Sequence, residues 1–180
     1  MSEFIVHTLE TAPEDSKPLL QDSIKAFGSI PNLHGVMAEA PAALKSYQVL
    51  HEQFLNTSLT PEEKTVVWQS INVEHGCHYC VPAHTAIAKM MKVDDAIIEA
   101  LLDQTPLPDE KLEVLRDTTL AIVRDRGVVS DDVMQRFYDA GYNRQQLLEI
   151  IVGVAQKVMS NYINHFAETP VDRQFQRYVR

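Results

Sequence analysis

The run Glu74-His75-Gly76-Cys77-His78-Tyr79-Cys80-Val81-Pro82-Ala83-His84 contains both cysteines of the chain and the signals for a corner between two helices. Gly76 predicts a break between two helices. Proline is tolerated only in the first turn of a helix, so Pro82 predicts a new helix that begins near Tyr79–Cys80 and runs to Lys92. Cys80 then lies at the positive end of that helix, and His84 follows it at i+4 on the same face.

On both sides of the corner that Gly76 and Pro82 predict, apolar residues recur with helical spacing. No run shows the alternating pattern of a strand. The sequence therefore predicts an all-α fold. The other expected helices cover Pro18–Phe27, Leu33–Ala38, Pro41–Asn56, Pro61 to Asn72–Glu74, Asp94–Gln104, Pro108–Arg126, Ser130–Ala140 and Arg144–Ala167.

Two helix starts suggest an internal repeat. The run Leu59–Lys64, in which Thr60-Pro61-Glu62-Glu63 supplies an N-cap and a capping box, resembles Leu107–Lys111 further along. Val93–Glu99 resembles Tyr142–Glu149 at nearly the same offset. One explanation is a duplication that produced two related helical units, of which the first carries the Cys-x-x-Cys site. The alternative is that the helix starts are similar by chance. The domain organisation that we expect is an N-terminal arm and first helix (1–26), one helical domain (27–172) and a C-terminal arm (173–180).

Composition and charge limit the classes of function. The 180 residues carry a net charge of −9 and have a pI near 5.2, without a basic cluster, so we expect no nucleic-acid partner. No apolar run is long enough for a membrane span, and the N-terminus lacks a signal-peptide pattern, so we expect a cytoplasmic protein without a membrane partner. Two cysteines are too few for a disulfide scaffold.

A Cys-x-x-Cys pair in such a protein indicates a redox pair or half a metal site. Cys80, nearest the helix dipole and His84, is expected to be the nucleophile, because a helix N-terminus stabilises a thiolate. Cys77 is the expected resolving thiol. His84 is the expected general base and proton relay, and Glu74 is expected to orient or recharge it.

Other interpretations of the same residues remain open. A zinc site could combine Cys77, Cys80 and His84 with His75 or His78, although all these ligands lie within ten residues of each other. A Cys-x-x-Cys without function is the third alternative.

Residues outside the motif are assigned mainly to the core or to the surface. We expect His51 to be a core or interface residue, and His7 and His34 to lie at the surface. Trp68 is expected in the core, with the alternative that it borders the thiol pocket.

The run Gly76–Ala86 resembles the motif of the alkylhydroperoxidase D-like proteins within the carboxymuconolactone decarboxylase family. The helix start Leu59–Lys64 and the flanks Phe27–Leu33 and Asn164–Asp172 are similar to peroxidase-related members. The resemblance covers most of residues 27–172. It implies an all-helical, cofactor-free fold without a metal, which assembles as a homo-oligomer (dimer, trimer or hexamer).

For the reaction, the resemblance implies a thiol-dependent peroxidase that reduces hydrogen peroxide or organic hydroperoxides. The cysteine matching Cys80 attacks the peroxide, the one matching Cys77 closes the disulfide, and a dithiol or protein reductant reopens it. The histidine matching His84 belongs to the proton relay. Two positions depart from the family pattern: Thr65 replaces the relay glutamate, and Tyr79 replaces a histidine. A redox sensor without turnover and a cofactor-free decarboxylase are the alternatives.

Overall fold

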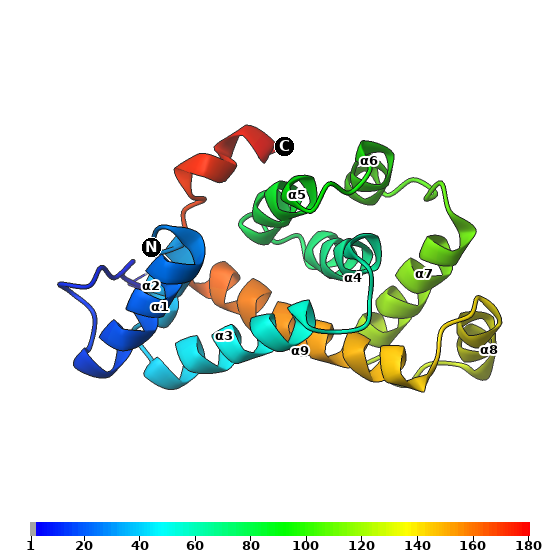
Figure 1. Cartoon of the computed structure of the whole chain (residues 1–180), viewed down its shortest axis with the longest axis horizontal. Helices are drawn as coiled ribbons and strands as arrows, with labels where there is room; N and C mark the ends of the chain where they lie inside the picture. The colour runs from blue at the N-terminus through cyan, green and yellow to red at the C-terminus, as the bar shows by residue number, and fades with distance from the viewer. Residues whose placement is uncertain (1–2) are drawn as a thin grey trace.

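The computed structural model describes residues 3–180, and within them the regular secondary structure is all helical (Figure 1). The α-helices are α1 (Lys17–Phe27), α2 (Asn32–Met37), α3 (Pro41–Leu55), α4 (Pro61–Glu74), α5 (Cys80–Met90), α6 (Asp95–Asp103), α7 (Glu110–Arg124), α8 (Asp131–Asp139) and α9 (Arg144–Ala167). Two 3-10 helices, η1 (Glu14–Ser16) and η2 (Arg173–Tyr178), flank them. The predicted all-α fold is confirmed, and every predicted helix is present with ends within three residues of the expected ones.

Helix α4 is the centre of the fold, and it packs against α5, α6, α7 and α9. Its residues from Thr65 to Asn72 are all buried, which explains why this helix has little amphipathic character. Figure 1 shows α3 and α9 running side by side below α4, with α5 and α6 above it. The cysteine corner therefore connects the central helix to the layer above it.

Local sequence signals set the ends of the helices around the corner. The Thr60 side chain accepts a hydrogen bond from the Glu63 backbone, and the Glu63 carboxylate accepts one from the Thr60 backbone N–H, which completes the predicted capping box. At the other end of α4, Gly76 adopts φ +58°, a conformation that side-chain-bearing residues rarely take. Helix α5 begins at Cys80, as Pro82 predicted.

Gly153 allows α9 to approach the core closely. A Cβ atom at this position would lie 2.6 Å from Cε2 of Phe54 and 3.0 Å from Cγ1 of Val67. Because Lys157 follows one turn later on the same face, this close approach also sets how deeply the α9 side chains reach toward α5.

The helical order is compatible with the expected repeat. Helix α7 begins 49 residues after α4 (Glu110 after Pro61), and α9 begins 49 residues after α6 (Arg144 after Asp95). The duplication and the domain boundaries both stay predictions. Within residues 3–180, no helix has the length and hydropathy that a membrane span requires.

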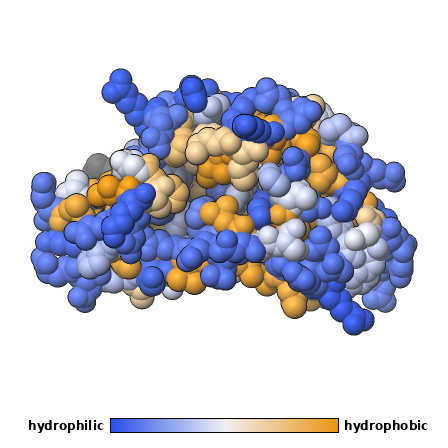
Figure 2. Space-filling view, in the orientation of Figure 1, coloured by the Kyte–Doolittle hydropathy of each residue, from blue (hydrophilic) through white to orange (hydrophobic). Residues whose placement is uncertain are grey.

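The two ends of the chain pack onto the helical body. His7 was expected at the surface, but the structure buries it. Its Nε2 forms a hydrogen bond with Glu39, and its backbone N–H donates to the Gly35 carbonyl, so the N-terminal segment is held against α2. The C-terminal residues form η2, which packs against α5, with Phe175 against the core around the cysteines. Figure 2 shows hydrophobic groups in the middle of this face, between the α1–α2 lobe and α5, within a largely hydrophilic surround.

Candidate functional site

The two cysteines form a buried, reduced pair at the start of α5. Cys77 is fully buried, and Cys80 is 1% exposed. The backbone N–H of Cys80 donates to the Cys77 sulfur at 3.3 Å, so the two side chains lie close together around the first turn. The predicted placement of Cys80 at the helix N-terminus, where the helix dipole stabilises a thiolate, is confirmed.

Helix α9 supplies the polar groups that surround the Cys80 sulfur. Asn164 Nδ2 donates to it at 3.3 Å, and Ser160 Oγ lies 3.7 Å away. Burial raises the pKa of Cys80, but the Cys77 hydrogen bond, the charge of Lys157 and the Ser160 hydroxyl outweigh it and lower the pKa to about 5. Cys80 is therefore the thiol that this environment favours as a thiolate.

Cys77 has the opposite electrostatic character. Its hydrogen bond to Cys80, together with burial, raises the pKa of the Cys77 thiol far above its ordinary value. The pair therefore favours a state in which Cys80 is a thiolate and Cys77 keeps its proton. The roles of an attacking Cys80 and a resolving Cys77 stay predictions.

His84 lies one turn beyond Cys80 and is 4% exposed. Its Nε2 bonds Lys157 Nζ at 2.7 Å, whereas its Nδ1 has no hydrogen-bond partner within residues 3–180. Burial, followed by the charge of Lys157, lowers the pKa of His84 well below its ordinary value, so the ring is neutral at pH 7. A neutral imidazole can both accept and donate a proton.

Lys157 is the residue that sequence reasoning missed. It is fully buried in α9, at a point where burial lowers the pKa of its amine and Cys80 and Cys77 raise it. A sequence signal was present: Gly153, Lys157, Ser160 and Asn164 follow helical spacing, so small and polar residues share one face of this helix.

Glu74 lies at the end of α4 and faces α7. Its two carboxylate oxygens accept hydrogen bonds from Arg124 at 2.8 and 2.6 Å, and these bonds lower the pKa of the carboxyl. Both residues line a surface cavity of about 200 Å³ that includes Leu101 and Arg116 and neither cysteine. The structure therefore brings Cys77, Cys80 and His84 together and gives Glu74 a different partner; the relay role of Glu74 stays a prediction.

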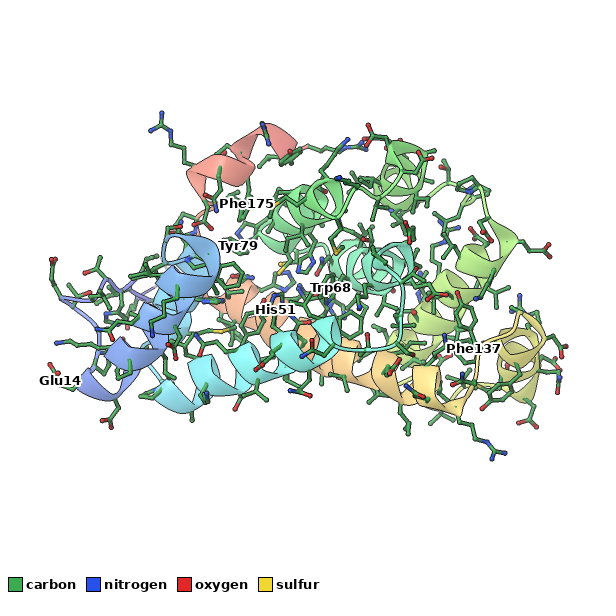
Figure 3. All side chains as sticks on the ribbon, viewed as in Figure 1. Glu14, His51, Trp68, Tyr79, Phe137 and Phe175 are labelled. Atoms are coloured by element: carbon green, nitrogen blue, oxygen red, sulfur yellow. The ribbon has the colours of Figure 1, made fainter. Side chains whose placement is uncertain are left out.

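The other residues of the corner hold it in place. His75 Nδ1 bonds Asn161, and His78 Nε2 bonds the Thr169 carbonyl, so the two alternative zinc ligands have other partners. No group of three metal-ligating side chains occurs within residues 3–180. Tyr79, between the cysteines, donates to Asp172 at 2.5 Å and fixes the C-terminal segment over the corner. Figure 3 shows Tyr79 and Phe175 next to each other under η2.

A stack of rings leads from the site into the α3 layer. The ring of Trp68 lies 4.7 Å from that of His84 and 5.8 Å from that of His51, and Figure 3 shows Trp68 and His51 together between α3 and α4. Gln156 joins them by accepting from Trp68 and bonding His51. Trp68 thus both packs in the core and borders the thiol site.

His34 corrects the expectation of a surface position. It is 5% exposed, its Nδ1 bonds Ser23, and its ring stacks edge-on against Tyr47. Burial, with a smaller effect of His51, lowers the pKa of His34 to about 3. The cause is tertiary: α2 is too short to show amphipathic spacing, and α1 and α3 cover it.

A second polar layer ties α4 to α5 and α9. Asn72 donates to Gln69, Gln69 donates to Thr85, and Asn161 donates to Asn72. Thr65, where the sequence resemblance implies a relay glutamate, is buried, and its hydroxyl has no partner within residues 3–180. The polar groups of this layer are therefore amides and hydroxyls, and they include no carboxylate.

Comparison with known proteins agrees with this geometry. Residues 38–109, which include the cysteines and His84, match the model of the carboxymuconolactone decarboxylase family. No curated protein sequence matches significantly.

Solved structures share the fold over nearly the whole chain. An uncharacterized peroxidase-related protein from Ralstonia eutropha JMP134 with an alkylhydroperoxidase AhpD core is 18% identical, with 97% of this chain and 94% of that chain covered and a TM-score of 0.84. A peroxidase-related protein from Silicibacter sp. TM1040 is 16% identical (99% and 94% covered, TM-score 0.81). A cysteine variant of the debrominase Bmp8 in complex with 2,3,4-tribromopyrrole is also 16% identical, with 100% of each chain covered and a TM-score of 0.78. The AhpD-like helical fold and the resemblance inferred from the sequence are thereby confirmed.

Proposed function

We propose that this AhpD-like chain is a thiol-dependent peroxidase that cycles between the Cys77–Cys80 dithiol and its disulfide. The observation that carries the proposal is the asymmetry of the pair: the pKa of Cys80 is lowered to about 5, whereas that of Cys77 is raised. A peroxidatic thiol has to be ionised at neutral pH, and its resolving partner has to hold a proton until the second step. The substrate is a small peroxide, and the reductant is a dithiol or a protein thiol.

In the first step the Cys80 thiolate attacks the distal peroxide oxygen. A sulfur–oxygen bond forms, the oxygen–oxygen bond breaks, and the leaving alkoxide or hydroxide takes a proton. Cys80 becomes a sulfenic acid. The neutral ring of His84, one turn along α5, supports its role as the group that moves this proton.

In the second step the Cys77 sulfur attacks the Cys80 sulfur. A disulfide bond forms, the sulfur–oxygen bond breaks, and the departing hydroxide takes the Cys77 proton and leaves as water. The 3.3 Å contact between the Cys80 backbone N–H and the Cys77 sulfur supports a short path for this closure. An external dithiol then returns two electrons and two protons.

The burial of both thiols limits the substrate. With exposed fractions of 0% and 1%, they favour a small electrophile that reaches the site through local opening of the corner. A dithiol can also deliver two electrons to a carbon–bromine bond, and the similarity to debrominase Bmp8 makes a brominated pyrrole the second electrophile to test.

Steady-state consumption of cumene hydroperoxide with dithiothreitol as reductant tests the proposal. We expect turnover in the wild type, none with Cys80→Ser, and a single turnover that stops at the sulfenic acid with Cys77→Ser. Parallel reactions with hydrogen peroxide and with 2,3,4-tribromopyrrole identify the electrophile that the site prefers.

The same assay separates the alternatives. A redox sensor would consume one equivalent of peroxide and then change its oligomer size, which light scattering would detect. A decarboxylase would not need the cysteines. Wild-type protein with two free thiols and no peroxide turnover would refute the peroxidase proposal.

A further inference from the structure

The amine of Lys157 lies in the protein interior and forms no ion pair with a carboxylate of the described residues. It is fully buried, and its hydrogen bond goes to His84 Nε2 at 2.7 Å. Burying an unpaired ammonium group is costly, so buried lysines are either paired with an anion or lose their proton. The groups around Lys157 must therefore decide its charge.

The titratable groups that face it come from two elements. Helix α3 contributes His51, which Lys157 affects directly, and Tyr47, which interacts with the two cysteines. The corner with α5 contributes Cys77, Cys80 and His84. From α4, the side chains at this level are Trp68, Gln69 and Asn72, which carry no charge. No carboxylate acts on Lys157 among the described residues.

Of these groups, a single one can supply the negative charge near pH 7. Burial raises the pKa of Tyr47 and lowers that of His51 to about 4, so both are neutral. The hydrogen bond to Cys80 keeps the proton on Cys77. The Cys80 thiolate is the anion that remains.

The contact with His84 adds a second consequence. When Lys157 is protonated, its Nζ is a donor without a lone pair, so His84 Nε2 has to accept the hydrogen bond. The single ring proton then lies on Nδ1, the nitrogen that has no partner within residues 3–180. That proton therefore has no acceptor within the described residues.

We propose that Lys157 is the counter-cation of the Cys80 thiolate and a positioning residue that fixes His84 in the Nδ1-protonated tautomer. This inference deepens the proposed peroxidase. When the peroxide bond breaks, His84 Nδ1 gives its proton to the leaving oxygen, and Nε2 takes a proton from Lys157. The lysine becomes neutral as the thiolate disappears, so no unpaired charge stays buried. Reduction of the disulfide by two electrons and two protons restores the Cys77 thiol, the Cys80 thiolate and the Lys157 ammonium group.

The first test measures the Cys80 thiolate by its absorbance at 240 nm against pH, without any peroxide. Lys157→Met keeps the length of the side chain and removes its charge. A nearby opposite charge typically shifts a pKa by about 1–3 pH units, so we expect a rise of that size. With a rise of about two, the thiolate fraction at pH 6 falls roughly tenfold. Lys157→Arg keeps the charge and should recover part of the shift, which a merely structural role would not do.

The second test does not depend on the folding of a lysine variant. In Cys80→Ser the anion is absent, so we expect the Lys157 amine to lose its proton at a lower pH than in reduced wild type. The 13Cε chemical shift of labelled Lys157 reports this change, and the 15N shifts of His84 report its tautomer. Wild type oxidised to the disulfide should behave like Cys80→Ser.

The inference is overturned if the Cys80 pKa is the same in wild type and Lys157→Met, or if Lys157 titrates identically with and without Cys80. Neither readout uses turnover. A wild type that fails to reduce peroxide but shows both shifts would refute the proposed function and leave the Lys157 assignment standing.

Discussion

The substitution Gly153→Ala tests whether the close packing of α9 against the core holds the site together. Gly153→Ala places a Cβ atom 2.6 Å from Cε2 and 3.0 Å from Cζ of Phe54, and 3.0 Å from Cγ1 of Val67. Phe54 is fully buried, and its ring lies 4.9 Å from that of Trp68. The ring therefore has no free space to move into, and α9 must shift outward instead.

Two opposing effects set the change in the free energy of unfolding. Overpacking of a buried site costs about 1–3 kcal/mol, and contact with two ring atoms and a methyl group argues for the upper half of that range. Alanine recovers about 1 kcal/mol of helix propensity. The net expectation is a loss of about 1–2 kcal/mol in the free energy of unfolding. For a chain of this size this lowers Tm by roughly 2–8 °C.

Urea unfolding followed by circular dichroism measures the loss, and a double-mutant cycle with Phe54→Leu is the matched control. The smaller side chain makes room for the new methyl group, so the pair should lose less than the sum of the single variants. The outward shift of α9 should also weaken the contact between Lys157 and His84 and raise the Cys80 pKa. An unchanged or higher Tm for Gly153→Ala would refute the packing argument.

The remaining predictions concern the thiol site and its cover. Because the thiolate form of Cys80 predominates above its pKa of about 5, the rate of oxidation by peroxide should be flat from about pH 6 to 8 and should fall about tenfold per pH unit below 5, as stopped-flow kinetics can measure. Asn164→Leu removes the 3.3 Å donor to Cys80 and should raise the thiol pKa by about 1–2 pH units in the 240 nm titration, since a hydrogen bond to a charged group contributes about 1.5–3 kcal/mol. Because the Glu74 carboxylate bonds Arg124, we expect Glu74→Gln to leave both the thiol pKa and turnover unchanged; a change in either would support the predicted relay role of Glu74. Tyr79→Phe removes the 2.5 Å bond to Asp172, so limited trypsin digestion should cut the C-terminal segment several times faster than in wild type, and an equal rate would argue against this anchor.

The helices and the dithiol could be predicted from local sequence signals. Thr60-Pro61-Glu62-Glu63 marks the start of α4, and Gly76 and Pro82 mark the corner, because capping and backbone conformation depend on a few neighbouring residues. The pairing of Cys77, Cys80 and His84 also follows from spacing alone. Local chemistry was enough for each of these features.

The surroundings of the thiols depend on contacts between helices that are far apart in the sequence. The spacing of Gly153 and Lys157 places both on one face of α9, but it does not show what that face contacts. The contact of Lys157 with His84, 73 residues earlier, depends on the close approach of α9 to the core at Gly153. Glu74 has the right sequence distance from the motif, but the turn at Gly76 separates it from α5, and Arg124 of α7 takes its carboxylate. Charges are assigned by burial and by partners from distant helices, so the acid–base chemistry of this site became visible only in the folded chain.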